Sequence, residues 1–300
     1  MPDIDGYVST GKRIRLSRLF KDPSGASLIF AIDHGMTSPT FLRGLEHTDD
    51  RIRDAIDGGA NVVMAGRAVS ARSAARFGGG ASLALMLTAS AAEAAGGPVV
   101  TRIGSVSEAL RLAADAVVVY VALGGEREAS MISYLSDIGE ECDRSGMPLI
   151  AEAEFPDAYS GSSSHDASWA TRYLTRNARL CAELGADIVK VNWSGSPESF
   201  SEVVAGCGKP VVVAGGPIVS DKELLTRMHE ARLVGAIGCS VGRNIFEHPD
   251  PAGLMRALSR IFEDGWPVTD AEQELADRRA GVSDGKATSR SGGRRGNLDA

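Results

Sequence analysis

The sequence predicts a single TIM (β/α)8 barrel of the α/β class, and three observations support this prediction. Eight short apolar segments are spaced along the chain between residues 28 and 240, and amphipathic helical stretches lie between most of them. The segments are apolar at nearly every position, as expected for parallel strands buried on both faces. No GxGxxG motif follows the first segment, which disfavours an open doubly wound sheet.

The elements follow one another in regular alternation. The expected strands are Leu28–Ile32, Asn61–Met64, Leu83–Leu87, Ala116–Val121, Leu149–Ala153, Ile188–Asn192, Pro210–Ala214 and Ala236–Ser240. The expected helices are Asp49–Ile56, Glu126–Ser145, Trp169–Leu184, Pro197–Val204 and Lys222–Leu233. Eight such βα units close a barrel in which the carboxyl ends of the strands carry the functional residues.

Both ends of the chain differ in composition from the expected barrel, residues 27–265. Residues 1–26 are polar, with a basic patch at Lys12–Arg15, and are expected to form a short helix or strand that covers the barrel floor. Residues 266–280 are expected to be a C-terminal helix or extension. Residues 281–300 are rich in Gly, Ser and Arg without apolar periodicity, which predicts a disordered tail.

Composition excludes several classes of function. A net charge of −7 argues against a dedicated nucleic-acid surface. No apolar run approaches the roughly 20 residues that span a membrane. The four cysteines form no CxxC pair, which is typical of reduced thiols in a cytoplasmic protein, and the five histidines lack the spacing of a zinc site. We therefore expect a cytoplasmic protein without a metal or other cofactor.

Lys190 is the most informative single residue. It lies in the expected buried strand at 188–192, where an ammonium group costs several kcal/mol unless it is paired or loses its proton. Desolvation favours the neutral amine, which is a nucleophile that can form a Schiff base with a carbonyl. Two structural alternatives stay open: the side chain could reach solvent, or it could form an ion pair that stabilises the fold.

Asp33 and His34 follow the first expected strand, at the same end of the barrel as Lys190. Asp33 and Lys190 would form either a structural ion pair or a Schiff-base lysine with the carboxylate that moves protons for it. His34 is either a wall of this site or a loop residue with a local hydrogen bond.

The loops after the last two expected strands are rich in glycine. They contain Gly215, Gly216, Gly242 and Arg243. Glycines allow backbone N–H groups to approach a phosphate closely, and arginine adds a charge-assisted contact. These loops form a recurrent phosphate site in this barrel, although the glycines could also serve only as tight turns.

Six segments together resemble one family: Gly11–Phe20, Ala31–Gly35, Gly146–Glu152, Glu183–Lys190, Pro210–Pro217 and Gly242–Phe246. Over residues 11–265 the chain resembles the archaeal-type class I aldolases. This family includes fructose-bisphosphate aldolases, 2-amino-3,7-dideoxy-D-threo-hept-6-ulosonate synthases and the phospho-autoinducer-2 thiolase branch. The ulosonate synthase branch looks closest.

The resemblance implies a role for each matching residue. Lys190 would be the Schiff-base lysine, Asp33 its acid/base partner, and the four residues of the glycine-rich loops would bind the substrate phosphate. It also implies a homo-oligomer, often a decamer in this family, and no metal.

One departure from the family pattern concerns proton transfer. Members carry a catalytic tyrosine at the end of strand five, where this chain has Phe155, and a phenyl ring cannot carry a proton. General acid–base catalysis by such a residue typically raises the reaction rate about 10²–10⁴-fold. The candidates to replace the tyrosine are Tyr120, Glu154, Tyr159 and His165, while Glu152 and Glu154 could instead be structural. Trp193 is expected to close one side of the site.

These residues predict a class I aldolase or transaldolase-type synthase. Its substrate would be a phosphorylated ketone such as dihydroxyacetone phosphate or a keto-sugar phosphate, with aspartate semialdehyde as an acceptor if the ulosonate synthase likeness holds. Two alternatives stay open: a lysine-dependent thiolase or acyl transferase acting on a phosphorylated diketone, and a non-catalytic barrel that binds a sugar phosphate.

Overall fold

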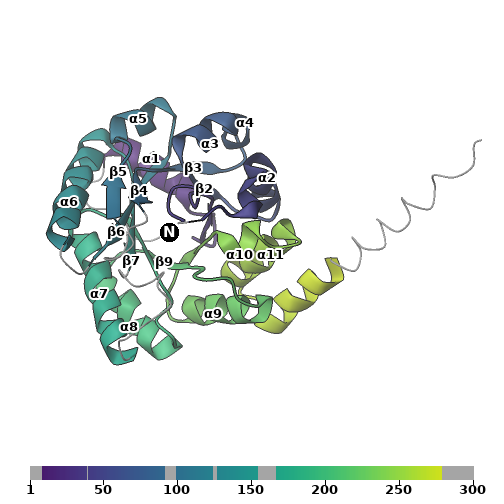
Figure 1. Cartoon of the computed structure of the whole chain (residues 1–300). Coiled ribbons are helices and arrows are strands. Elements are labelled where there is room, and N and C mark those ends of the chain that lie inside the picture. The colour runs from purple at the N-terminus through teal and green to yellow at the C-terminus, as the bar shows by residue number, and fades with distance from the viewer. Residues whose placement is uncertain (1–8, 39, 92–98, 124–126, 155–166, 279–300) are drawn as a thin grey trace, which may run out of the picture.

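The chain folds into a closed barrel of eight parallel strands surrounded by helices (Figure 1). The computed structural model describes residues 9–38, 40–91, 99–123, 127–154 and 167–278. The barrel strands are β1 (Ser27–Ala31), β2 (Val62–Ala65), β3 (Ser82–Met86), β6 (Ala116–Ala122), β7 (Leu149–Glu154), β8 (Ile188–Val191), β9 (Val211–Ala214) and β10 (Gly238–Val241). Strand β1 pairs with both β2 and β10, which closes the ring. The predicted barrel is therefore confirmed, and each predicted strand boundary lies within two residues of the observed one.

The helices form the outer layer of the molecule. The five predicted helices are confirmed as α2 (Thr48–Asp57), α6 (Glu128–Ser145), α7 (Ala167–Glu183), α8 (Pro197–Cys207) and α9 (Asp221–Leu233). Helical segments that were not predicted from the sequence are α3 (Arg67–Arg72), α4 (Ala74–Phe77), α5 (Val106–Arg111), α10 (Arg243–Phe246), α11 (Pro251–Ser259), the 3-10 turn η1 (Arg43–Leu45) and the π-helical turn η2 (Arg260–Asp264). No described helix is long and apolar enough to cross a membrane.

The interior of the barrel is packed with apolar side chains and is closed at its amino end by helix α1 (Thr10–Leu19). Leu16, Leu19 and Phe20 pack against strand residues in one cluster, whose other buried members are Ile29, Ala31, Val62, Met64, Ala84, Met86, Ala116, Val118, Ile150, Ile188 and Val212. Lys12 anchors the helix, since its Nζ lies 2.7 Å from Asp143 Oδ1 and 3.0 Å from Asp187 Oδ2. The interior of the barrel is thus filled by side chains at this end. The functional residues of such a barrel lie at the opposite end, where the strands have their carboxyl termini.

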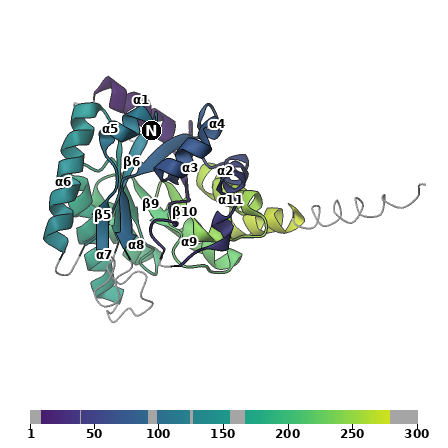
Figure 2. The same ribbon diagram turned by 45° about the horizontal axis from the view of Figure 1, so that its top comes forward.

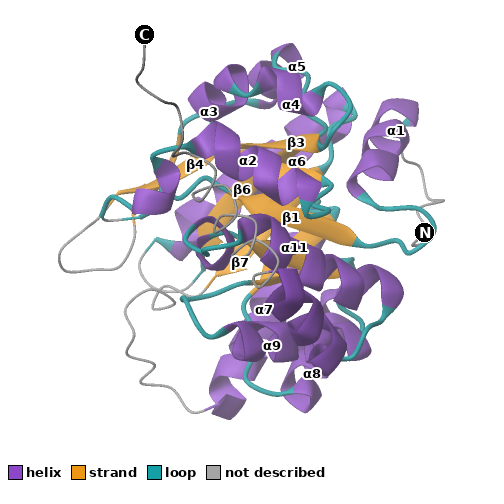
Figure 3. Cartoon of the chain, turned by 90° about the vertical axis from the view of Figure 1, so that its right-hand side faces the viewer, coloured by secondary structure: helices purple, strands orange, loops and turns teal. Residues whose placement is uncertain are grey.

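A two-stranded antiparallel sheet, β4 (Thr88–Ala91) and β5 (Val99–Arg102), was not predicted from the sequence. It lies at the end of the barrel opposite α1 (Figures 2 and 3). The backbone N–H of Ser90 donates a 3.0 Å hydrogen bond to the carbonyl of Met36, so the sheet lies against the loop that follows β1.

The chain after η2 returns to the helical layer. Residues 268–278 are helical, and Ala271 and Leu275 are buried. Two long ion pairs, Arg260–Glu274 at 3.5 Å and Arg278–Asp250 at 3.6 Å, join this helix to the preceding segments.

Candidate active site

Lys190 lies on the inner side of the barrel, next to a carboxyl group of the neighbouring strand. The pairing of β6, β7, β8 and β9 puts Tyr120, Glu152, Lys190 and Val212 side by side in one row. Residues directly paired in a parallel sheet point to the same face, and Val212 belongs to the interior cluster. Lys190 Nζ donates a 2.6 Å hydrogen bond to Glu152 Oε1.

The Lys190–Glu152 pair is almost completely shielded from water. Lys190 is 7% exposed and Glu152 is 2% exposed. Lys190 therefore does not reach solvent, which removes one of the two structural alternatives. The sequence predicts only a structural role for Glu152, because nothing local distinguishes it from Glu154. The alternation of side chains along β7 could have predicted its position. Ile150 and Glu152 are two residues apart, so both face the interior of the barrel.

Asp33 is a second buried carboxyl group in the field of Lys190. It follows β1 and is 5% exposed. Burial raises the pKa of Asp33, and the positive charge of Lys190 opposes that rise. Burial likewise raises the pKa of Glu152, again against the attraction of Lys190. One lysine is thus placed among two carboxyl groups that both retain protons more readily than ordinary acids.

His34 lies beside Asp33, with 3.6 Å between His34 Nδ1 and Asp33 Oδ1. Its ring contacts Phe246 edge-on, with the ring centroids 5.2 Å apart. Burial, reinforced by the charges of Lys190 and Arg243, lowers the pKa of His34 to about 3. The imidazole is therefore neutral at physiological pH.

The two glycine-rich loops, after β9 and β10, are tied together by side chains of α10. Arg243 Nη2 donates to the carbonyl of Gly216 over 3.1 Å. Asn244 donates through Nδ2 to the carbonyls of Gly215 and Pro217, and its Oδ1 accepts from the N–H of Val219. Asn244 was not predicted from the sequence as a site residue, although it directly follows Arg243.

Gly242 is required by close packing. A Cβ atom at this position would stand 2.4 Å from His34 Cε1 and 2.5 Å from the carbonyl oxygen of Ala31. We therefore expect Gly242→Ala to displace His34 and to lower the free energy of unfolding by about 1–3 kcal/mol, as measured by urea denaturation. Gly35→Ala is a matched control, because a Cβ there meets nothing within 4 Å. Equal losses in the two variants would show that contact with His34 is not the cause.

The remaining predicted residues are placed as follows. Tyr120 is buried, two residues beyond the interior residue Val118 and next to Glu152 in register. The ring of Trp193 packs against Phe200 of α8, with centroids 5.1 Å apart. Glu154 is the last residue of β7, paired with Ala122. Phe155, Tyr159 and His165 lie outside the described residues.

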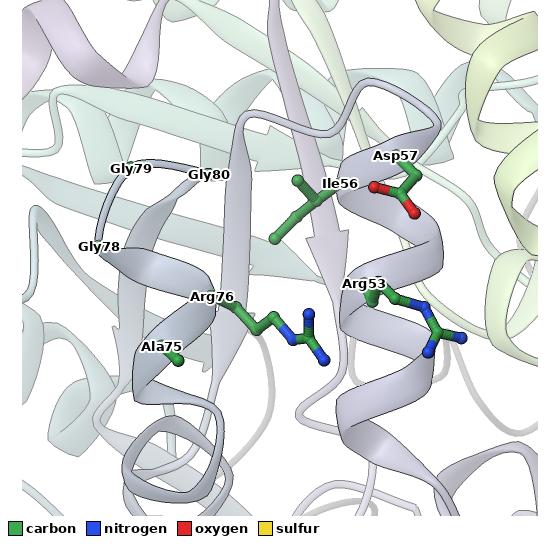
Figure 4. Close-up of a pocket in the computed structure, with 8 residues that line it drawn as sticks. All are labelled: Arg53, Ile56, Asp57, Ala75, Arg76, Gly78, Gly79 and Gly80. Carbon is green, nitrogen blue, oxygen red and sulfur yellow. The ribbon is translucent and has the colours of Figure 1, made fainter.

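A surface hollow of about 320 Å³ lies elsewhere, between α2 and the Gly78–Gly80 loop (Figure 4). It is lined by Arg53 and Arg76, and both guanidinium groups already have carboxylate partners: Arg53 pairs with Asp50 and Asp54 at 2.9 Å, and Arg76 with Asp49 at 2.7 Å. Neither guanidinium group of the hollow is therefore left without a carboxylate partner. Within the described ranges, no group of three or more His, Cys, Asp or Glu residues is placed to hold a metal ion.

A (β/α)8 barrel with a buried lysine amine beside two buried carboxyl groups is an arrangement typical of barrel enzymes that act through a lysine. The model of the DeoC/LacD family aldolases matches residues 27–248, and the chain belongs to this family. It is therefore an aldolase-type enzyme, which forms or cleaves carbon–carbon bonds through a Schiff base.

Individual relatives agree with this assignment. A 2-amino-3,7-dideoxy-D-threo-hept-6-ulosonate synthase of Halobacterium salinarum is 34% identical over 92% of this chain and 98% of its own length. A 2-amino-4,5-dihydroxy-6-oxo-7-(phosphonooxy)heptanoate synthase of Streptomyces griseus is 36% identical over 53% of this chain and 57% of its own. A solved archaeal fructose-1,6-bisphosphate aldolase, with its catalytic lysine bound to the carbinolamine intermediate, is 28% identical with a TM-score of 0.73 and covers 84% of this chain and 99% of its own.

Proposed function

We propose that this chain is a synthase that joins a phosphorylated ketone to an aldehyde through a Schiff base on Lys190. The observation that carries the proposal is the buried contact between the Lys190 amine and Glu152, in a barrel whose solved aldolase relative has a catalytic lysine. A lysine that is desolvated and has a proton acceptor at 2.6 Å can release its proton and attack a carbonyl.

The chemistry of the relatives' products supports a particular pair of substrates. The Streptomyces griseus product is a β-hydroxy ketone, with its ketone at carbon 6 and a hydroxyl group at carbon 4. An aldol reaction makes the bond between carbons 4 and 5 of such a compound from dihydroxyacetone phosphate and aspartate semialdehyde. The same disconnection of the Halobacterium salinarum product yields the same aldehyde. We therefore assign aspartate semialdehyde as the acceptor, and dihydroxyacetone phosphate or a keto-sugar phosphate as the donor.

The other site residues take supporting roles in this proposal. Asp33 exchanges protons with the bound substrate, and Gly215, Gly216, Gly242 and Arg243 hold its phosphate. The hydrogen bond from Arg243 to the Gly216 carbonyl supports this phosphate site, since it joins the two loops. His34, Phe155 and Trp193 are assigned to the walls. Tyr120, Glu154, Tyr159 and His165 stay as candidates for the proton transfer that a tyrosine performs in relatives.

The proposal extends to the state of the protein in the cell. We place it in the cytoplasm as a homo-oligomer, with a decamer as the specific candidate, and with no nucleic-acid or membrane partner. Large apolar side chains exposed on the described surface support self-association: Phe41 is 71% exposed and Ile218 is 60% exposed.

Reductive trapping tests the proposed function directly. With dihydroxyacetone phosphate and sodium borohydride, we expect one stable adduct per chain by intact-mass analysis, and peptide mapping should locate it on Lys190. Addition of aspartate semialdehyde without reductant should yield a seven-carbon phosphorylated amino acid. A protein that binds the phosphate but gives no adduct would contradict the Schiff-base proposal.

A further inference from the structure

Glu152 is in direct contact with the amine that the proposed reaction uses. The contact is made between residues paired in register on adjacent strands, β7 and β8, and so it does not depend on a loop. A buried pair of this kind contributes little net stability, because the loss of hydration offsets the attraction between the charges. In this row, Tyr120 is the other neighbour of Glu152, and Val212 is the other neighbour of Lys190. A chemical role therefore explains the pair better than a structural one.

We propose that Glu152 is a catalytic residue that carries the proton of the Lys190 amine during Schiff-base formation, an inference that rests on the proposed function. The Glu152 carboxylate takes one proton from the ammonium, which leaves a neutral amine and a carboxylic acid. The amine attacks the ketone carbon, and a proton moves from nitrogen to the former ketone oxygen to give the carbinolamine. Glu152 then returns its proton to that hydroxyl, which leaves as water, and the iminium ion remains with the carboxylate restored.

The position of the second buried carboxyl group, that of Asp33, agrees with this role of Glu152. Asp33 follows β1, and β10 and β9 separate β1 from β8 in the barrel. Asp33 therefore approaches Lys190 from a different direction than Glu152 does. Its Oδ1 atom is buried and accepts no hydrogen bond from the described residues. Glu152 thus acts on the lysine nitrogen, and Asp33 is left to exchange protons with the bound substrate.

The electrostatics of both carboxyl groups suit proton transfer. Burial raises the pKa of Glu152 and of Asp33. A general acid or base works best when its pKa lies near the working pH. An ordinary exposed glutamate would hold too little of the acid form at neutral pH to protonate a leaving hydroxyl group.

The test compares the rate of trapping in two isosteric variants. The rate of adduct formation is measured by intact mass with saturating dihydroxyacetone phosphate and cyanoborohydride. Glu152→Gln keeps an acceptor for the Lys190 hydrogen bond but cannot take up the proton, so we expect this rate to fall about 10²–10⁴-fold. Asp33→Asn should slow trapping less than Glu152→Gln does, and it should lose formation of the seven-carbon product. The proposal is overturned if Glu152→Gln slows trapping less than tenfold, or less than Asp33→Asn does.

A rescue experiment separates proton transfer from a merely structural role. Glu152→Ala leaves space beside Lys190, and sodium formate should then raise the trapping rate in proportion to its concentration. Formate should not rescue Glu152→Gln, whose amide fills the space. Absence of rescue in a Glu152→Ala protein with a native circular dichroism spectrum would count against the proposal. A wild-type protein that forms no adduct would instead overturn the proposed function itself, so the two failures are distinguishable.

Discussion

Replacing Lys190 by methionine should abolish turnover while leaving the protein folded. Loss of a covalent nucleophile typically costs about 10⁵–10⁶-fold in kcat. Methionine has a similar length and no charge, so it fits the row between Glu152 and Val212. Glu152 loses the positive neighbour that lowers its pKa, and its carboxyl group therefore stays protonated and neutral in the interior.

The measurement is product formation from dihydroxyacetone phosphate and aspartate semialdehyde, together with borohydride trapping. Lys222→Met is the matched control, because it makes the same change at an exposed position of α9 and should leave both readouts unchanged. A Lys190→Met protein that turned over at more than about one per cent of the wild-type rate would disprove the role of this amine.

Stability of the Lys190→Met variant should depend on pH in a predictable direction. The pKa of Glu152 is raised in the folded state, so its contribution to stability is fully present below the unfolded pKa of about 4.5 and is lost as the pH rises through the folded value. Without Lys190 the folded pKa rises further. The free energy of unfolding of this variant should therefore fall more steeply between roughly pH 5 and pH 8 than that of the wild type.

The strands could be predicted from the sequence because burial on both faces leaves a local signal. Segments such as Ala116–Ala122 are apolar at every position except Tyr120, and glycines or polar residues mark their ends. The β4–β5 sheet had no such signal. Its strands are short, are not buried on both faces of a sheet, and include polar residues such as Thr88, Ser90 and Arg102.

The site divides in the same way between local and nonlocal information. Lys190 could be found from the sequence because a lysine inside an apolar strand is costly wherever its partner lies. Its partner could not be found in this way. The contact with Glu152 depends on the register between β7 and β8, and a shift of one residue would turn Glu152 to the other face. The position of His34 could not be predicted from the sequence either, because it depends on the pairing of β10 with β1. This pairing brings Gly242 against the His34 ring.

The closure of the barrel should be the most sensitive point of the fold, and Gly238→Ala should show it. Gly238 pairs with Ser27 where β10 meets β1, and an added Cβ would stand 1.8 Å from the Ser27 carbonyl oxygen and 2.9 Å from its nitrogen. Because these are backbone atoms, no change of rotamer relieves the clash, and the two strands must separate. We expect a loss of about 3 kcal/mol or more in the free energy of unfolding, measured by urea denaturation.

Gly78→Ala is the control for this change. Gly78 has a φ of −74°, and a Cβ there meets nothing within 4 Å, so alanine should change stability by less than about 0.5 kcal/mol. Gly238→Ala should also slow formation of the seven-carbon product, because Asp33 follows β1 and moves with it. A free energy of unfolding of Gly238→Ala within about 1 kcal/mol of that of the control would contradict this prediction. It would show that the β1–β10 junction can open without loss of the barrel.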